Sequence, residues 1–83
     1  MKIEDAFNEF FSSHKQHSLN PRLSRLDIQT KLGSNVTEDQ PGDKVNHEWR
    51  FYADGAECAI WDYKGTKWSA YGPWEVFEKL GMF

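Results

Sequence analysis

Apolar and polar positions alternate with a period of two over most of residues 48–71, and two tight-turn signals interrupt this alternation. The signals are Asp54-Gly55 and Lys64-Gly65. Short pairs of this kind connect antiparallel strands in hairpins. The segment therefore predicts a three-stranded antiparallel meander.

A two-residue turn at each signal sets the register of the meander. The first turn predicts the pairs Ala53 with Ala56, Phe51 with Cys58, Trp49 with Ile60, and Glu48 with Trp61. The second predicts Tyr63 with Thr66, Asp62 with Lys67, Trp61 with Trp68, and Cys58 with Tyr71. Paired residues share a face of the sheet.

These registers place bulky apolar side chains on both faces of the meander. We expect the core face to carry Trp49, Phe51, Cys58, Ile60, Ser69 and Tyr71. The second face is expected to carry Glu48, Arg50, Tyr52, Ala59, Trp61, Tyr63, Trp68 and Ala70.

Helical patterns flank the meander on both sides. Residues 3–15 carry apolar and aromatic side chains at helical spacing, which predicts an N-terminal helix: Ile3, Phe7, Phe10, Phe11 and His14. After Pro73, a stripe of Val76, Phe77 and Leu80 ends at Gly81 and predicts a short C-terminal helix.

The chain between the first helix and the meander is less regular. Apolar Leu26, Ile28 and Leu32 alternate with polar residues, which predicts a further strand over residues 26–32. Residues 33–45 are polar and rich in turn formers, so we expect a long surface loop there. The fold class is therefore α+β, with two helices and an antiparallel sheet of three to four strands in one domain of residues 1–83.

The sequence does not determine which face of the sheet each of the two helices covers. If both helices pack on the face with Trp49, the second face stays open; if they divide, both faces are covered. Fully burying an aromatic side chain is worth about 1.5–3 kcal/mol, which favours at least partial cover of the second face.

Charge and composition narrow the class of protein. The 83 residues carry a net charge of −3, which argues against a general binder of phosphate backbones. No run of 18 apolar residues occurs, and the first residues carry Glu4 and Asp5 in place of an apolar signal segment. The single Cys58 excludes an internal disulfide and favours a reduced, cytoplasmic protein. We therefore expect no association with a membrane.

Candidate catalytic and metal-ligating residues are sparse. Cys58 falls on the expected core face, where a thiol is a small hydrophobe and not a nucleophile. His14 and His17 are three positions apart, but the spacing places no third ligand beside them. With no nucleotide-binding, hydrolase or metalloprotease motif in the chain, we expect no enzyme, no cofactor and no metal.

The surplus of aromatic side chains on the second face predicts a binding surface. We expect a protein partner, or a second copy of the chain in a homodimer, to contact Arg50, Tyr52, Trp61, Tyr63 and Trp68. The alternative is single-stranded nucleic acid, whose bases stack on aromatic side chains displayed by a sheet.

Overall fold

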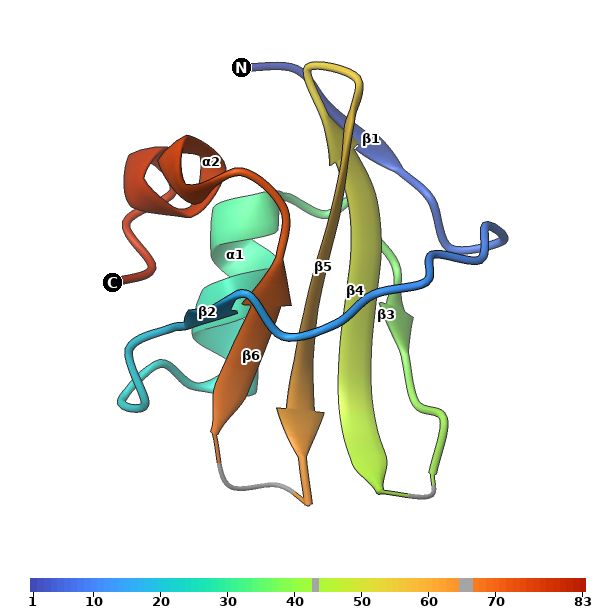
Figure 1. Ribbon diagram of the computed structural model, residues 1–83, viewed down its shortest axis with the longest axis vertical. Helices are drawn as coiled ribbons and strands as arrows, with labels where there is room; N and C mark the ends of the chain where they lie inside the picture. The colour runs from blue at the N-terminus through green and yellow to red at the C-terminus, as the bar shows by residue number, and fades with distance from the viewer. Residues whose placement is uncertain (43, 65–66) are drawn as a thin grey trace.

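Six strands of the described residues form one antiparallel sheet in the computed structural model; in the view of Figure 1, α1 lies behind β6 and α2 lies beside the sheet. The structure describes residues 1–42, 44–64 and 67–83. The elements in chain order are β1 (Ile3–Asp5), β2 (His17–Ser18), α1 (Arg25–Leu32), β3 (Glu38–Asp39), β4 (Val45–Ala53), β5 (Ala56–Tyr63), β6 (Trp68–Tyr71) and α2 (Trp74–Lys79). The α+β class is confirmed, but the expected three to four strands are six in the described residues.

The β4–β5 hairpin has the register that its turn residues predict. Asp54 and Gly55 both adopt positive φ, at 49° and 84°, which is the requirement of the tight turn that matches strand twist. All four predicted pairs are present, from Ala53 with Ala56 to Glu48 with Trp61.

The β5–β6 register is shifted by one residue from the prediction, which is therefore wrong. Trp61 pairs with Ser69 and not with Trp68, and Asp62 pairs with Trp68 and not with Lys67. The predicted pair of Tyr63 with Thr66 lies outside the described residues. A shift of one position moves every side chain of a strand to the opposite face. Trp68 and Ala70 therefore join the core face, and Ser69 and Tyr71 leave it.

The predicted N-terminal helix is absent. Residues 3–5 form β1 and pair with the outer edge of β4, residues 17–18 form β2 and pair with β6, and residues 6–16 between them have no regular secondary structure. The apolar residues that predicted the helix lie on two sides of the sheet. Ile3 packs against the main core, and Phe11 packs in a second cluster. Pairing with two sheet edges outweighs the local preference, because a helix of this length is marginal without tertiary contacts.

The strand expected over residues 26–32 is the helix α1. Its start is a capping box: Ser24 Oγ accepts the Asp27 amide at 3.0 Å, and the Asp27 carboxylate accepts the Ser24 amide at 2.9 Å. Ile28 and Leu32, four positions apart, are the buried residues of this helix. Residues four positions apart share a face in a strand as well as in a helix, so the apolar pattern did not distinguish a strand from a helix here.

The C-terminal helix is confirmed as α2, with Val76 and Phe77 buried and Pro73 at the N-cap. The expected loop over residues 33–45 contains β3, and its Val36 is buried in the main core. No helix in the described part of the chain is long and apolar enough to cross a membrane.

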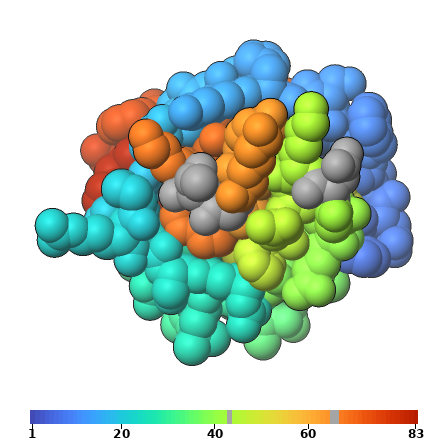
Figure 2. Space-filling view, turned by 90° about the horizontal axis from the view of Figure 1, so that it is seen from below, coloured from blue at the N-terminus to red at the C-terminus, as the bar shows by residue number. Residues whose placement is uncertain are grey.

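The main core lies between the sheet and the two helices. Its buried residues come from both helices, the strands and the connections: Leu19, Ile28, Leu32, Val36, Trp49, Phe51, Ala53, Cys58, Ile60, Trp68, Ala70, Val76, Phe77 and Met82. Figure 2, seen from below, shows strand residues emerging between the N-terminal segment on one side and α1 on the other. The sheet is therefore covered by α1 behind, flanked by α2, and crossed by residues 6–16 in front.

Candidate functional site

The face of the sheet opposite the helices, here called the front face, carries Arg50, Tyr52, Ala59, Trp61 and Tyr71. Arg50 pairs with Ala59, and Ala59 pairs with Tyr71, so these three lie in one row across β4, β5 and β6. Tyr52 and Trp61 are half-buried on either side of this row. The front face therefore offers aromatic rings and one guanidinium group.

Residues 6–16, here called the strap, cross the front face from one edge of the sheet to the other (Figure 1). The Ala6 amide donates to the Arg50 carbonyl at 3.0 Å, and the Gln16 amide donates to the Ala70 carbonyl at 2.9 Å. Between these ends Phe11 is buried against the front face, with its ring edge-to-face with Tyr52 at 5.4 Å. The strap therefore supplies the partial cover that the aromatic content of this face favours.

Arg50 links the strap to the sheet. Its guanidinium donates to the Phe7 carbonyl at 2.6 Å and to the Glu48 carboxylate at 2.7 Å, and it lies 3.3 Å from the Asp39 carboxylate. Burial raises the pKa of Glu48; the Arg50 charge opposes that rise, and the Asp39 charge adds to it. With only 14% of its side chain exposed, Arg50 is mainly an internal connection.

The structure brings together three of the five predicted contact residues, Arg50, Tyr52 and Trp61. Tyr63 lies further along β5 on the same side and is 47% exposed, with Lys64 Nζ 5.4 Å from its ring centroid. Trp68 lies on the other side of the sheet, 8% exposed, where its Nε1 donates to the Leu23 carbonyl at 2.6 Å. Trp68 therefore belongs to the core, because the strand register differs from the predicted one.

The strap adds aromatic surface that the predicted set did not contain. Phe10 is 89% exposed and Phe7 is 36% exposed. His14 packs edge-to-face against Tyr71 with ring centroids 5.6 Å apart. The pattern of these residues predicts a helix, so the sequence carried no signal that the strap would cross the front face.

Cys58 is fully buried, and burial raises the pKa of its thiol to about 11. The thiol therefore stays protonated near neutral pH, where the thiolate is the form that reacts with electrophiles.

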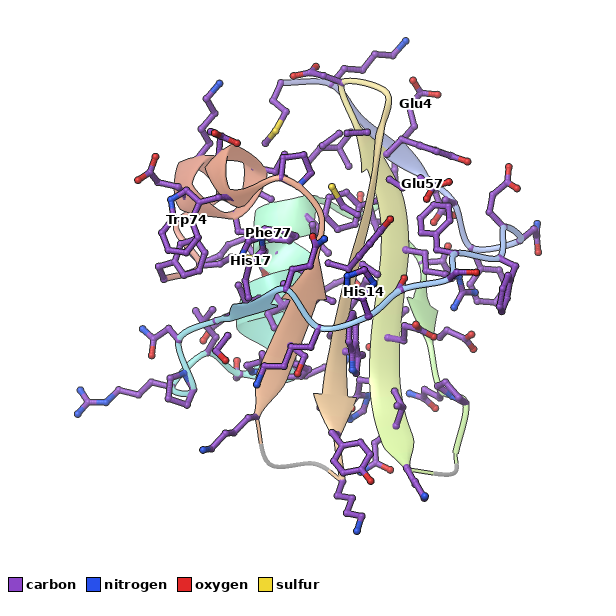
Figure 3. All side chains as sticks on the ribbon, in the orientation of Figure 1. Glu4, His14, His17, Glu57, Trp74 and Phe77 are labelled. Atoms are coloured by element: carbon purple, nitrogen blue, oxygen red, sulfur yellow. The ribbon has the colours of Figure 1, made fainter. Side chains whose placement is uncertain are left out.

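His14 and His17 have different surroundings (Figure 3). His17 Nε2 lies 2.7 Å from the Gly72 carbonyl oxygen, and its ring is 5.5 Å from Trp74 and 5.8 Å from Phe77. His14 instead contacts Tyr71. Residues 1–42, 44–64 and 67–83 contain neither a pocket nor a group of three His, Cys, Asp or Glu side chains placed to hold a metal ion.

A comparison with protein-family models, with curated proteins and with solved structures finds no match to this chain.

Proposed function

We propose that this chain is a small non-enzymatic binding or regulatory domain that acts through protein contacts on its front side. The observation that carries the proposal is the exposure of large aromatic side chains there, with Phe10 at 89%, Tyr63 at 47% and Phe7 at 36%. Phe7 and Phe10 belong to the strap, which crosses the front face, and the Phe7 ring lies 5.9 Å from the Arg50 guanidinium. Tyr63 is two positions after Trp61 on β5, on the same side of the sheet. Tyrosine, tryptophan and phenylalanine are enriched where proteins bind each other.

The chemistry of the other candidate residues supports a binding role over a catalytic one. The Cys58 thiol is protonated and buried, and the His17 ring nitrogen that faces Gly72 is engaged with a backbone carbonyl. The proposal includes a reducing, cytoplasmic location, where an unpaired cysteine is typical.

The direct test compares exposed residues on the two sides of the sheet. Phe10→Ala and Tyr63→Ala remove exposed front-side rings, whereas Leu26→Ala removes a residue that is 64% exposed on α1, behind the sheet. Crosslinking in the source cells, followed by binding measurements with the purified partner, should show weaker binding for the two front-side variants alone. Equal binding by all three variants and the parent would reject the front side as the contact surface.

Two further measurements separate the kinds of partner. Light scattering after size-exclusion chromatography over a concentration series detects a homodimer, which Phe10→Ala or Tyr63→Ala should weaken. Fluorescence anisotropy with a single-stranded oligonucleotide at roughly 50 mM salt tests the alternative. Oligonucleotide binding that the front-side variants weaken would replace the protein partner by a nucleic acid.

A further inference from the structure

We infer that the strap is a displaceable cover, which opens as a unit while the sheet and helices stay folded. Opening removes Phe11 from the front face and exposes Tyr52, Trp61 and Tyr71, the residues packed around it. The inference rests on the proposed function in treating this face as the contact surface. The strap would then be an autoinhibitory element that a partner must displace.

The length of the strap permits this movement. It joins β1 to β2, the two outermost strands in the order β1-β4-β5-β6-β2. Four steps between neighbouring strands span about 19 Å, at about 4.8 Å a step. A chain of eleven extended residues reaches about 36–40 Å. A turn closed by the Glu9 amide and the Ala6 carbonyl takes up part of the excess, so the strap is not stretched.

Few hydrogen bonds and apolar contacts hold the strap on the sheet, and they are separate from the main core. Its backbone-to-backbone bonds to the sheet are at its two ends, at Ala6 and Gln16. Side chains add two bonds near the same ends, from Arg50 to the Phe7 carbonyl and from the Gly72 amide to Gln16 Oε1. Phe11 is its large buried side chain, in a small cluster with Ala6 and Ala59 that is distinct from the main core. Segments with few buried apolar contacts open locally at lower free energy than the body of a protein.

The strap also has an alternative conformation. Phe7, Phe10, Phe11 and His14 lie on one side of a helix, whereas in the strap Phe11 is buried and Phe10 is 89% exposed. An isolated helix of this length is marginal in water, so opening in the free protein yields a disordered chain. A partner with an apolar groove would favour the helix by covering this stripe.

Native-state hydrogen exchange, followed by NMR at increasing denaturant below the unfolding transition, tests the inference on the unmodified chain. The Ala6 and Gln16 amides report the strap, and the hydrogen-bonded amides of β4 and β5 report the sheet. The strap amides should exchange at least about 100-fold faster than the sheet amides, with little dependence on denaturant. Equal protection of both sets would overturn the inference.

A pair of neighbouring variants provides the control. Phe11→Ala removes the buried ring and should raise exchange of the Ala6 and Gln16 amides about tenfold or more, without changing the β4 and β5 amides. Phe10→Ala removes an exposed ring of the same size and should change neither set. A uniform increase at all amides in Phe11→Ala would show that the strap opens only with the whole domain. If Phe11→Ala does not fold, Phe11 belongs to the global core and the inference fails.

Partner binding distinguishes this inference from the proposed function. If the strap opens independently and Phe11→Ala binds the partner more tightly, both stand. If the strap opens but Phe11→Ala and the parent bind the partner with equal affinity, the autoinhibitory role is overturned. If the strap does not open but Phe10→Ala and Tyr63→Ala still weaken binding, the function stands and the displaceable strap is rejected.

Discussion

At the scale of single residues, Trp49 and Arg50 show how neighbours on one strand serve opposite sides of the sheet. Trp49 is fully buried, its Nε1 donates to Gln29 Oε1 at 3.0 Å, and its ring lies 5.6 Å from Trp68. Arg50 points to the front, where it bonds the Phe7 carbonyl and two carboxylates. Trp49 therefore contributes to the main core, and Arg50 fastens the strap.

We predict that Trp49→Ala loses about 3–5 kcal/mol of unfolding free energy, which is typical of a truncated buried tryptophan and is a large part of the stability of a small domain. Arg50→Ala should lose less, about 1–3 kcal/mol, because it leaves Glu48 partly buried without its cation but keeps the main core. The loss is expected because the Arg50 guanidinium bonds the Phe7 carbonyl and the carboxylates of Glu48 and Asp39. Urea denaturation of both variants measures the difference, and equal midpoints would contradict it.

The surroundings of Gly72 leave no room for any residue with a side chain. Its φ is 131°, and a Cβ there would lie 2.8 Å from Cys58 Sγ and 3.1 Å from the Glu57 carbonyl oxygen. A side chain would therefore collide with β5 at the point where β6 turns toward α2.

At the scale of elements, the far end of the β4–β5 hairpin is held by a side chain that replaces a backbone partner. Between the pairs Val45 with Tyr63 and Glu48 with Trp61, β4 has two residues opposite the single Asp62, which is a β-bulge. Asp62 is 5% exposed, and its Oδ1 accepts the amides of Asn46 at 3.0 Å and His47 at 2.7 Å. This carboxylate thus satisfies the donors that the bulge leaves unpaired.

We predict that Asp62→Ala lowers the unfolding free energy by about 1–3 kcal/mol, since it leaves two amides without an acceptor. Asp62→Asn should retain most of the stability, because both amides bond one oxygen that an asparagine amide also provides. Thermal unfolding of both variants checks the bulge. If Asp62→Asn loses as much stability as Asp62→Ala, the negative charge and not the acceptor geometry stabilises this end of the hairpin.

At the scale of the whole molecule, Glu38 on β3 connects the helix layer to the sheet edge. Its carboxylate accepts Arg25 Nη1 at 2.6 Å from α1 and Gln40 Nε2 at 3.2 Å, and it pairs with His47 of β4. Burial acts to raise the pKa of Glu38, but the hydrogen bonds from Arg25, Gln40 and His47 outweigh it and lower the pKa. The ionised carboxylate is therefore the form that stabilises the fold.

A lowered pKa in the folded state gives stability that is present above the unfolded value of 4.5 and is lost as the pH falls through the folded value. We predict that Glu38→Gln is less stable than the parent at pH 7 by about 1–2 kcal/mol, and that this difference shrinks as the pH falls below the unfolded value of 4.5. Glu75→Gln, at an exposed position of α2, is the matched control and should have nearly the stability of the parent at pH 7. Urea midpoints from pH 3 to pH 7 measure the effect; a constant gap between Glu38→Gln and the parent would contradict it.

The sequence by itself determined the β4–β5 hairpin, its register and the burial of Trp49, Phe51 and Cys58. Asp54 and Gly55 tolerate positive φ, and the pairs that follow are close in the chain, so local chemistry was sufficient. The same holds for α2, where Pro73 and Gly81 bound one short apolar stripe.

The N-terminal half and the cover of the front face depend on contacts between segments that are distant in the sequence. The segment with a helical pattern pairs at its two ends with β4 and β6, whose backbone groups provide hydrogen-bond partners. Between these ends Phe11 packs on the front face. The capping box at Ser24 marked α1, but residues 26–32 fit both periods, and burial of Ile28 and Leu32 against the sheet selected the helix. Trp68 belongs to the core and not to the expected contact surface, because the register between β5 and β6 is shifted by one residue. Contacts between distant segments cannot be read from local periodicity, because their free energy depends on which surfaces the rest of the chain leaves uncovered.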